Sequence, residues 1–513
     1  MQTIEQYRIF EVVLEGTDKG NPYRDVELSA RFTSERGADS VVVQGFYRGD
    51  GRYGIRFMPT LEGSWSFETT SSDALLDGAR GELFVEPAQA SNHGRVLRSK
   101  DVMHTSALFD SSLDFTFSFE DGTRFLPFGT TCYAWINQPA AVQEQTLRTL
   151  AHAPFNKLRM CIFPKFYDYN HEDPELFPFP GDPTDGFDRA RFNEPFWENL
   201  DRRLSQLDEM GIQADIILLH PYDKPEWGFS SMSTEEDIFY LSYVARRYAA
   251  FKNIWWSLAN EFDLMPHKTV EDWDRYARVI MANDPWGHLR SIHNCRTVFD
   301  HTHPWITHVS WQRIDVRRTA ECVSELRRAY GKPVVVDECA YEGNISWGWG
   351  NISGEEMVRR FWEGVLRGGY LTHGETFVDR GPQIWWAHGG RLHGESPARI
   401  AFCREFMESL PQDMDHVAGE VFTLAGTFTW DVTCMADKQG SGTDCILIYF
   451  GLSRPAYRDF VLPEGSRYAI DVIDTWNMTV ERAHEDMSGA FRLELPSRPY
   501  MLVRMQARGE NAL

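Results

Sequence analysis

Two glutamates follow short apolar runs, and their positions suggest carboxylate chemistry. Glu261 comes directly after Asn260 and the run Ile254–Leu258, and Glu338 closely follows Val334–Val336. Both runs are too short for helices and too apolar on both faces for an open antiparallel sheet. They therefore predict strands of a parallel sheet, buried on both sides. In a (β/α)8 barrel, the carboxyl ends of such strands face the active site.

Two carboxylates on one rim of a barrel are what glycoside hydrolysis needs. One protonates the leaving oxygen and the other attacks the anomeric carbon, and for retention of configuration they stand roughly 5–5.5 Å apart. A single strand-end glutamate is as easily explained by an ion pair with a neighbouring arginine. The second one, Glu338 beside Glu261, favours the catalytic interpretation.

An Asn-Glu pair closing the fourth barrel strand and a Glu closing the seventh resemble clan A of the glycoside hydrolases. The resemblance implies that Glu261 is the acid/base, that Glu338 is the nucleophile, and that Asn260 contacts the substrate. Within the clan the chain is most similar to endoglucanase-like and apiosidase-like barrels. Those proteins carry a β-sandwich before the barrel and a small β-domain after it, and the similarity covers essentially the whole chain.

The periodicity of the rest of the sequence predicts the same architecture. Residues 1–95 and 413–513 alternate between apolar and polar positions, which indicates an N-terminal immunoglobulin-like β-sandwich and a small C-terminal antiparallel β-sandwich. Residues 96–412 hold eight strand-like runs with helical periods between most of them, which predicts a central (β/α)8 TIM barrel. The sixth strand is expected at Ile306–Val309, and no helix is visible between the fifth and sixth strands.

Three further polar residues occupy predicted strands or strand ends. Arg159 lies in the second strand, His220 follows the third, and His293 follows the fifth. We expect them to hydrogen-bond the nucleophile and the sugar, although each could equally be an internal hydrogen-bond partner. Arg159 near Glu338 would keep that carboxylate ionised, whereas Glu261 needs a raised pKa to act as an acid near neutral pH.

Aromatic faces can stack on the apolar face of a sugar ring. The tryptophans that follow or lie within barrel strands are the candidates for such a platform, and each of them could instead be a core residue. They are Trp135, Trp311, Trp385 and Trp386.

Composition excludes several other classes of protein. The 52 basic and 75 acidic residues give a net charge of −23, which argues against nucleic acid or an anionic membrane as a partner. No stretch of about 18 apolar residues suggests a membrane span. The opening MQTIEQYRIF lacks signal-peptide features, and the eight cysteines are scattered without a CxxC motif. We therefore expect free thiols and a cytoplasmic protein.

A histidine cluster is the one feature that suggests a metal. His301, His303 and His308 have a ligand-like spacing, but Pro304 and a predicted strand intervene, and no carboxylate or cysteine completes the set. We predict no metal and no cofactor.

The favoured function is a retaining glycosidase that acts on short glycosides or oligosaccharides. The alternatives are an endo-β-glucanase-like enzyme on longer glucans and a catalytically silent carbohydrate-binding protein. The expected partner is a small carbohydrate, and the sequence leaves homo-oligomerisation open.

Overall fold

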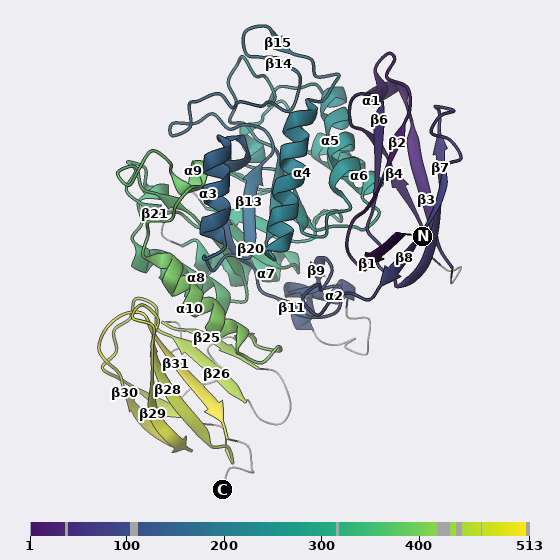
Figure 1. Cartoon of the computed structure of the whole chain (residues 1–513). Coiled ribbons are helices and arrows are strands. Elements are labelled where there is room, and N and C mark those ends of the chain that lie inside the picture. Colours follow the sequence, from purple (N-terminus) through teal and green to yellow (C-terminus); the bar gives the residue numbers. More distant parts are fainter. Residues whose placement is uncertain are drawn as a thin grey trace.

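The computed structural model describes residues 2–35, 39–102, 111–313, 318–417, 431–437, 444–462 and 464–508. An eight-stranded parallel barrel stands between two β-domains whose strands pair mostly antiparallel, which confirms the predicted fold class (Figure 1). The strands of the first β-domain lie between Gln2 and Glu86, and those of the last lie between Asp415 and Ala507.

The N-terminal domain consists of two packed sheets. Strand β3 shows why it forms: Leu28, Ala30, Phe32 and Ser34 are buried in alternation with more exposed residues, so one face meets the facing sheet. Phe32 stacks on Phe57 of that facing sheet, with ring centroids 4.0 Å apart. One sheet has the order β1 (Gln2–Glu5), β8 (Arg80–Glu86), β7 (Gly63–Ser71), β3 (Leu28–Ser34) and β4 (Ser40–Gln44); the other has the order β2 (Phe10–Glu15), β6 (Arg52–Phe57) and β5 (Phe46–Tyr47).

The barrel strands are parallel neighbours in the order β18, β17, β16, β13, β12, β22, β20, β19. The ring closes between its two end strands, where the Thr307 N–H donates to the Arg290 carbonyl at 2.9 Å. In chain order the strands are β12 (Phe128–Thr131), β13 (Lys157–Cys161), β16 (Gln213–Leu219), β17 (Ile254–Ala259), β18 (Arg290–Ser291), β19 (Val309–Gln312), β20 (Val334–Glu338) and β22 (Tyr370–His373).

The sixth barrel strand differs from its prediction at both ends. The sixth strand begins at Val309 rather than Ile306 because Thr307 is already bonded to the end of β18. The strand continues to Gln312, so it includes Trp311 and Gln312, which the sequence had placed after the strand.

Helices cover the outside of the barrel, and several start at a defined cap. Ser233 and Glu236 form a capping box at α5, and Thr269 and Asp272 form one at α6. Between β18 and β19 the described chain contains no helix, as the sequence indicated. The main helices are α3 (Ala140–Leu150), α4 (Glu194–Glu209), α5 (Thr234–Tyr248), α6 (Val270–Asn283), α7 (Val323–Tyr330), α8 (Gly354–Leu366) and α10 (Ser396–Glu408).

Short helices and strands close one end of the barrel and extend from the loops at the other. The strands β9, β10 and β11 form a small antiparallel sheet whose Phe117 and Phe125 join Trp255, Val335 and Tyr370 in one apolar cluster. These elements are α1 (Pro22–Asp25), β9 (Val96–Arg98), α2 (Ser99–Val102), β10 (Phe117–Phe119), β11 (Arg124–Phe125), β14 (Gly181–Asp182), β15 (Gly186–Phe187), β21 (Glu342–Gly343), β23 (Glu375–Thr376) and α9 (Trp385–His388).

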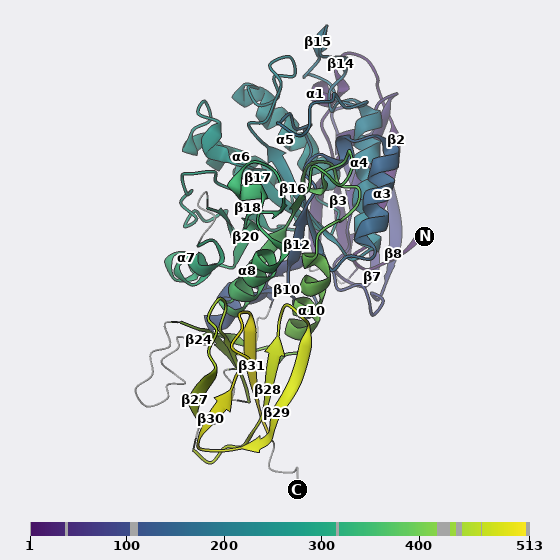
Figure 2. The same cartoon turned by 90° about the vertical axis from the view of Figure 1, so that its left-hand side faces the viewer.

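Both β-domains pack tightly on the barrel. Arg56 of the first domain pairs with Asp201 of α4 at 2.6 Å, and Arg247 of α5 pairs with the same carboxylate at 2.8 Å. The last domain lies against α8 and α10, where Leu447 and Leu502 share a core with Trp362 (Figure 2). One of its sheets has the order β24 (Asp415–Val417), β25 (Thr433–Ala436), β26 (Cys445–Tyr449), β31 (Met501–Ala507), β28 (Tyr468–Asp474) and β29 (Thr479–Met487). The other pairs β27 (Tyr457–Val461) with β30 (Ala490–Glu494).

None of the helices in these ranges has the length and apolar character needed to cross a bilayer.

Candidate active site

Glu261 leaves strand β17 through an unusual backbone conformation. Its φ is 53°, in the left-handed region that residues other than glycine seldom adopt. Strain of this kind tends to occur at functional sites. The carboxylate is held at both oxygens: Gln312 donates to Oε1 at 2.6 Å, and the Tyr222 hydroxyl donates to Oε2. The side chain is therefore fixed at the rim, between β16 and β19.

Glu338 is positioned by a β-bulge. Along β19 and β20, Trp311 pairs with Val336 and the next residue, Gln312, pairs with Glu338, so that Asp337 is an extra residue in the ladder. Bulges of this kind re-aim side chains next to active sites. The Tyr133 hydroxyl donates to Glu338 Oε1 and lies 3.3 Å from Asn260 Oδ1. Tyr133 thus links the residues that end the fourth and seventh barrel strands.

The two carboxylates are close enough to influence each other. Burial, and then the charge of Glu261, raise the pKa of Glu338 to about 7, while Lys165, Tyr133 and Arg159 act in the opposite direction. Like charges resist ionising together, so the charge of Glu261 favours the protonated form of Glu338. Two neighbouring carboxyl groups on one barrel rim are the arrangement that glycoside hydrolysis uses.

Lys165 is a buried ammonium in an aromatic cage. Its Nζ lies 3.8 Å from the ring centroid of Tyr133, 4.2 Å from that of Tyr222 and 4.8 Å from that of Trp386. Burial lowers its pKa, and the charges of Glu261 and Glu338 oppose that shift. The two tyrosines that hold the carboxylates therefore also hold a cation next to them.

A compensated layer of charges lies below the rim, inside the barrel. Lys157 donates to Asp215 at 2.7 Å and to Asp337 at 2.8 Å, and Arg159 donates to Asp215 at 2.9 Å. All four side chains are fully buried. Burial opposes ionisation of Asp337, but Lys157 and Arg159 hold its pKa well below the usual range.

Arg159 is connected to the rim through the side-chain amide of Asn260. Its second amino group donates to Asn260 Oδ1 at 3.1 Å, and the structure shows no hydrogen bond from it to Glu338. Its charge acts on Glu338 only at a distance, and despite that charge the pKa of Glu338 is raised by burial and by Glu261. Arg159 therefore positions Asn260, whereas the sequence had suggested a direct contact with the nucleophile.

The two predicted histidines differ in their surroundings. The Tyr222 N–H donates to His220 Nδ1 at 3.2 Å, so Nε2 carries the hydrogen that is donated to the Phe163 carbonyl, also at 3.2 Å. His220 thereby supports Tyr222, which in turn holds Glu261. Both ring nitrogens of the buried His293 lack a hydrogen-bond partner among the described residues. Burial, then the charge of Arg159, lower its pKa.

The four predicted tryptophans separate into two groups. Trp386 lies at the site, against Tyr133 and Lys165. The other three lie in the hydrophobic cores beneath the helices: Trp135 donates to the Met160 sulfur, Trp385 donates to Thr130, and Trp311 packs in the core cluster of α7 and α8. The structure does not bring these three to the carboxylates. Strand alternation turns Trp311 to the helix side, and Trp135 and Trp385 belong to the main hydrophobic core.

Sequence reasoning missed four residues that touch the site: Tyr133, Lys165, Tyr222 and Gln312. Each follows or ends a barrel strand, so position relative to the strands could have selected them. Nothing in the local sequence singles out their contacts, since each reaches a residue of another strand.

His301, His303 and His308, considered above as metal ligands, do not form a group with metal-ligand geometry among the described residues. His303 pairs with Asp274 at 2.7 Å, and neither ring nitrogen of His301 has a partner among the described residues. Within the described ranges, the one group of three side chains with metal-ligand geometry lies elsewhere and comprises Glu342, His373 and Glu375.

Comparisons with known proteins identify the family of this chain. Residues 114–412 match the family model for the apiosidase-like catalytic domain, and residues 3–72 and 430–506 match two domains of unknown function, DUF5060 and DUF5605. A search of curated proteins finds no match. The fold and the carboxylate pair define a glycoside hydrolase, and the chain belongs to the apiosidase-like family.

Solved structures support the same assignment. A crystal structure of a candidate glycoside hydrolase from Bacteroides vulgatus ATCC 8482 is 34% identical, with a TM-score of 0.88, and the match covers 99% of this chain and 100% of that one. A family 5 glycoside hydrolase from the same organism is 15% identical with a TM-score of 0.61, covering 82% and 94%, and shows the shared fold. The protein is therefore a glycosidase of the clan A barrel type.

Proposed function

We propose that the protein is a retaining glycosidase in which Glu261 is the acid/base and Glu338 is the nucleophile. The observation that carries the proposal is the pair of rim carboxylates, each held by its own tyrosine hydroxyl, with Lys165 between those tyrosines. The clan resemblance of the Asn260-Glu261 motif gives the same division of roles.

The two steps use Glu261 first as an acid and then as a base. In the first, Glu261 gives its proton to the leaving oxygen while ionised Glu338 attacks the anomeric carbon and the glycosidic bond breaks. In the second, Glu261 takes a proton from water, which displaces Glu338 from the sugar. The first step requires ionised Glu338, and Lys165 and Tyr133 favour that form against the opposing effects of burial and the charge of Glu261.

The charges of the site favour a neutral sugar as substrate. Lys157 and Arg159 balance Asp215 and Asp337 below the rim. At the rim, the charge of Lys165 opposes those of Glu261 and Glu338. A substrate carboxylate would add a negative charge that no described cation of this group is free to pair.

A short glycoside is favoured over a long glucan. Long chains need a series of aromatic platforms along a groove, and of the four candidate tryptophans only Trp386 lies at the site. Asn260, with its oxygen held by Arg159, and Trp386 are the proposed substrate contacts. An endo-β-glucanase-like enzyme is the alternative within the same chemistry.

The decisive test is chemical rescue of Glu261→Ala. An activated aryl glycoside needs no acid in the first step, so glycosylation of the enzyme should persist while hydrolysis of unactivated substrates is lost. Azide needs no base, so it should restore turnover and give a glycosyl azide with the substrate's own anomeric configuration. Screening aryl glycosides of neutral sugars, uronides and longer glucans in parallel identifies the substrate class.

The matched variant is Glu338→Ala, with which azide should attack directly and give the inverted product. A fluorosugar that traps the intermediate should label Glu338. Inverted azide product from Glu261→Ala, or rescue of neither variant, would show that the assigned roles are wrong. Sugar binding without any hydrolysis across the screen would instead favour a silent carbohydrate-binding protein.

We also propose that the enzyme works in the cytoplasm. All eight cysteines are unpaired, and seven of them are buried, a pattern typical of reducing compartments. Thiol titration of the denatured, unreduced protein should give eight free thiols. Disulfides in the protein isolated from its native cells would contradict the placement.

A further inference from the structure

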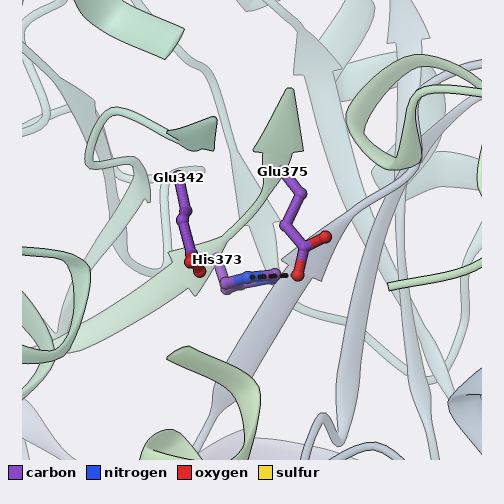
Figure 3. A group of neighbouring side chains, drawn as sticks. All are labelled: Glu342, His373 and Glu375. Carbon is purple, nitrogen blue, oxygen red and sulfur yellow. Dashed lines mark ion pairs between the residues drawn. The ribbon is translucent and has the colours of Figure 1, made fainter. Parts of the chain in front are cut away.

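Three buried side chains gather on the helix side of the barrel wall: Glu342, His373 and Glu375 (Figure 3). Their exposed fractions are 3%, 0% and 1%. The short strands β21 and β23 pair in parallel and set Glu342 opposite Glu375, while His373 ends β22. One ligand atom of each residue lies within 4.8 Å of the other two.

Two of the atoms that face each other in this group have no partner. His373 Nε2 and Glu375 Oε1 lack any hydrogen bond among the described residues, although they lie 3.7 Å apart. Buried polar atoms are nearly always satisfied, so a facing pair without partners points to something between them.

The other atoms of the group are already held. His373 Nδ1 lies 3.1 Å from Thr130 Oγ1, and the His393 N–H donates to Glu375 Oε2 at 2.7 Å. Glu342 accepts hydrogen bonds from the Glu395 N–H at 2.8 Å and the Ser396 N–H at 3.1 Å, at the start of α10. These bonds fix the three side chains, and His373 Nε2 and Glu375 Oε1 are left facing each other.

The backbone of Gly394 lies directly against the group. A Cβ at that position would come within 2.7 Å of Glu375 Oε1 and closer still to Glu342, so only glycine fits there. The loop backbone therefore covers the group without placing a side chain in it.

The charges of the group call for a cation or a proton. Two buried carboxyl groups lie side by side there, and no lysine or arginine is paired with either among the described residues. The imidazole of His373 presents a lone pair from Nε2 when Nδ1–H donates to Thr130. This arrangement, with the second ring nitrogen bonded to an oxygen, is the usual one for a metal-bound histidine.

We propose that Glu342, His373 and Glu375 bind one Zn²⁺ ion. One imidazole nitrogen and two carboxylate oxygens are ligands that zinc accepts, and two bonds of roughly 2.1 Å span the separation of the free atoms at an open angle. The ion neutralises both carboxylates. It links β21, β22 and β23 next to the start of α10, so its role is structural. Glu342 itself lies four residues after Glu338.

Metal analysis and thermal unfolding of the full chain, purified without a histidine tag, test the proposal. After equilibration with Zn²⁺ and removal of the excess, one zinc per chain is expected. The Tm should rise by several degrees with Zn²⁺ and fall on chelation. Glu375→Gln keeps the size of the side chain but should lose the ion and the Tm response.

His301→Gln is the matched control, because His301 is equally buried and unpartnered but lies outside the group. It should bind zinc like the parent chain. A parent chain that retains no zinc and shows no Tm response means that a proton occupies the space, and the proposal is wrong. Zinc retained by Glu375→Gln would equally overturn it. The parent chain alone decides the question if the variant does not fold.

Discussion

The barrel interior holds two layers of charge that differ in how completely their members are paired. In the lower layer, Lys157 and Arg159 are bonded to Asp215 and Asp337, and every formal charge has an opposite one beside it. In the upper layer, Glu261 and Glu338 are held by neutral donors, and Lys165 is held by aromatic rings. The lower layer fixes structure, whereas the upper layer keeps charge available for a reaction.

Adjacent residues on one strand show the contrast most directly. Asp337 accepts from Lys157 at 2.8 Å and from Thr372 at 3.2 Å, and also from Ser310. Glu338 accepts from the Tyr133 hydroxyl, and its pKa is about 7. Substitutions at the two positions should therefore separate loss of activity from loss of stability.

The largest effect is expected at Glu338. Glu338→Gln removes the proposed nucleophile, so turnover should fall by roughly four orders of magnitude or more, as for other essential nucleophiles. The Tm should change little, because an amide of the same size keeps a hydrogen-bond acceptor for Tyr133. Steady-state kinetics and thermal unfolding measure the two quantities, and an active Glu338→Gln would refute the role.

The next effect is on stability, at Asp337. Asp337→Asn leaves Lys157 and Arg159 with one buried negative charge fewer, which should cost about 3–5 kcal/mol of unfolding free energy. Urea unfolding measures it. Ser310→Ala, which removes a neutral donor to the same carboxylate, is the control and should cost only about 1 kcal/mol. Equal costs for the two variants would mean that the lower layer is not organised by charge.

A smaller effect is expected at Tyr133. Tyr133→Phe removes the hydroxyl that holds Glu338, and a hydrogen bond to a charged group contributes about 1.5–3 kcal/mol. Turnover should therefore fall by roughly ten- to a hundredfold. Tyr240→Phe loses a buried hydroxyl bonded to the Leu218 carbonyl, so it should lower stability and leave kcat unchanged. Similar kcat values for Tyr133→Phe and the parent enzyme would contradict this role.

The smallest effect concerns pH dependence. Lys165 lowers the pKa of Glu338, so Lys165→Met should raise it. Activity requires one ionised carboxylate, and the acid limb of the kcat/KM profile should consequently move to higher pH, by about one unit. Lys224→Met is the control: Lys224 also lies over aromatic rings but pairs with Asp173. A shift to lower pH, or the same shift in both variants, would show that Lys165 does not act on the pair.

The sequence by itself determined the barrel, the two flanking β-domains and the strand ends that carry Glu261 and Glu338. Local patterns were sufficient, because burial on both faces and the helical period are recorded in consecutive residues. The tertiary structure alone decided which residues meet across strands. Tyr133, Tyr222 and Gln312 contact carboxylates from other strands, and the bulge at Asp337 depends on the register with β19.

Tertiary structure also decided where the four tryptophans lie and which residues Arg159 contacts. A tryptophan after a strand looks the same in sequence whether it faces the rim or the helices, and strand alternation together with loop packing turned three of the four away from the site. The charge of Arg159 was visible, but its partners were not, since Asp215 and Asn260 lie on neighbouring strands. Residue type specifies what a side chain can do, and only the pairing of distant strands specifies what it meets.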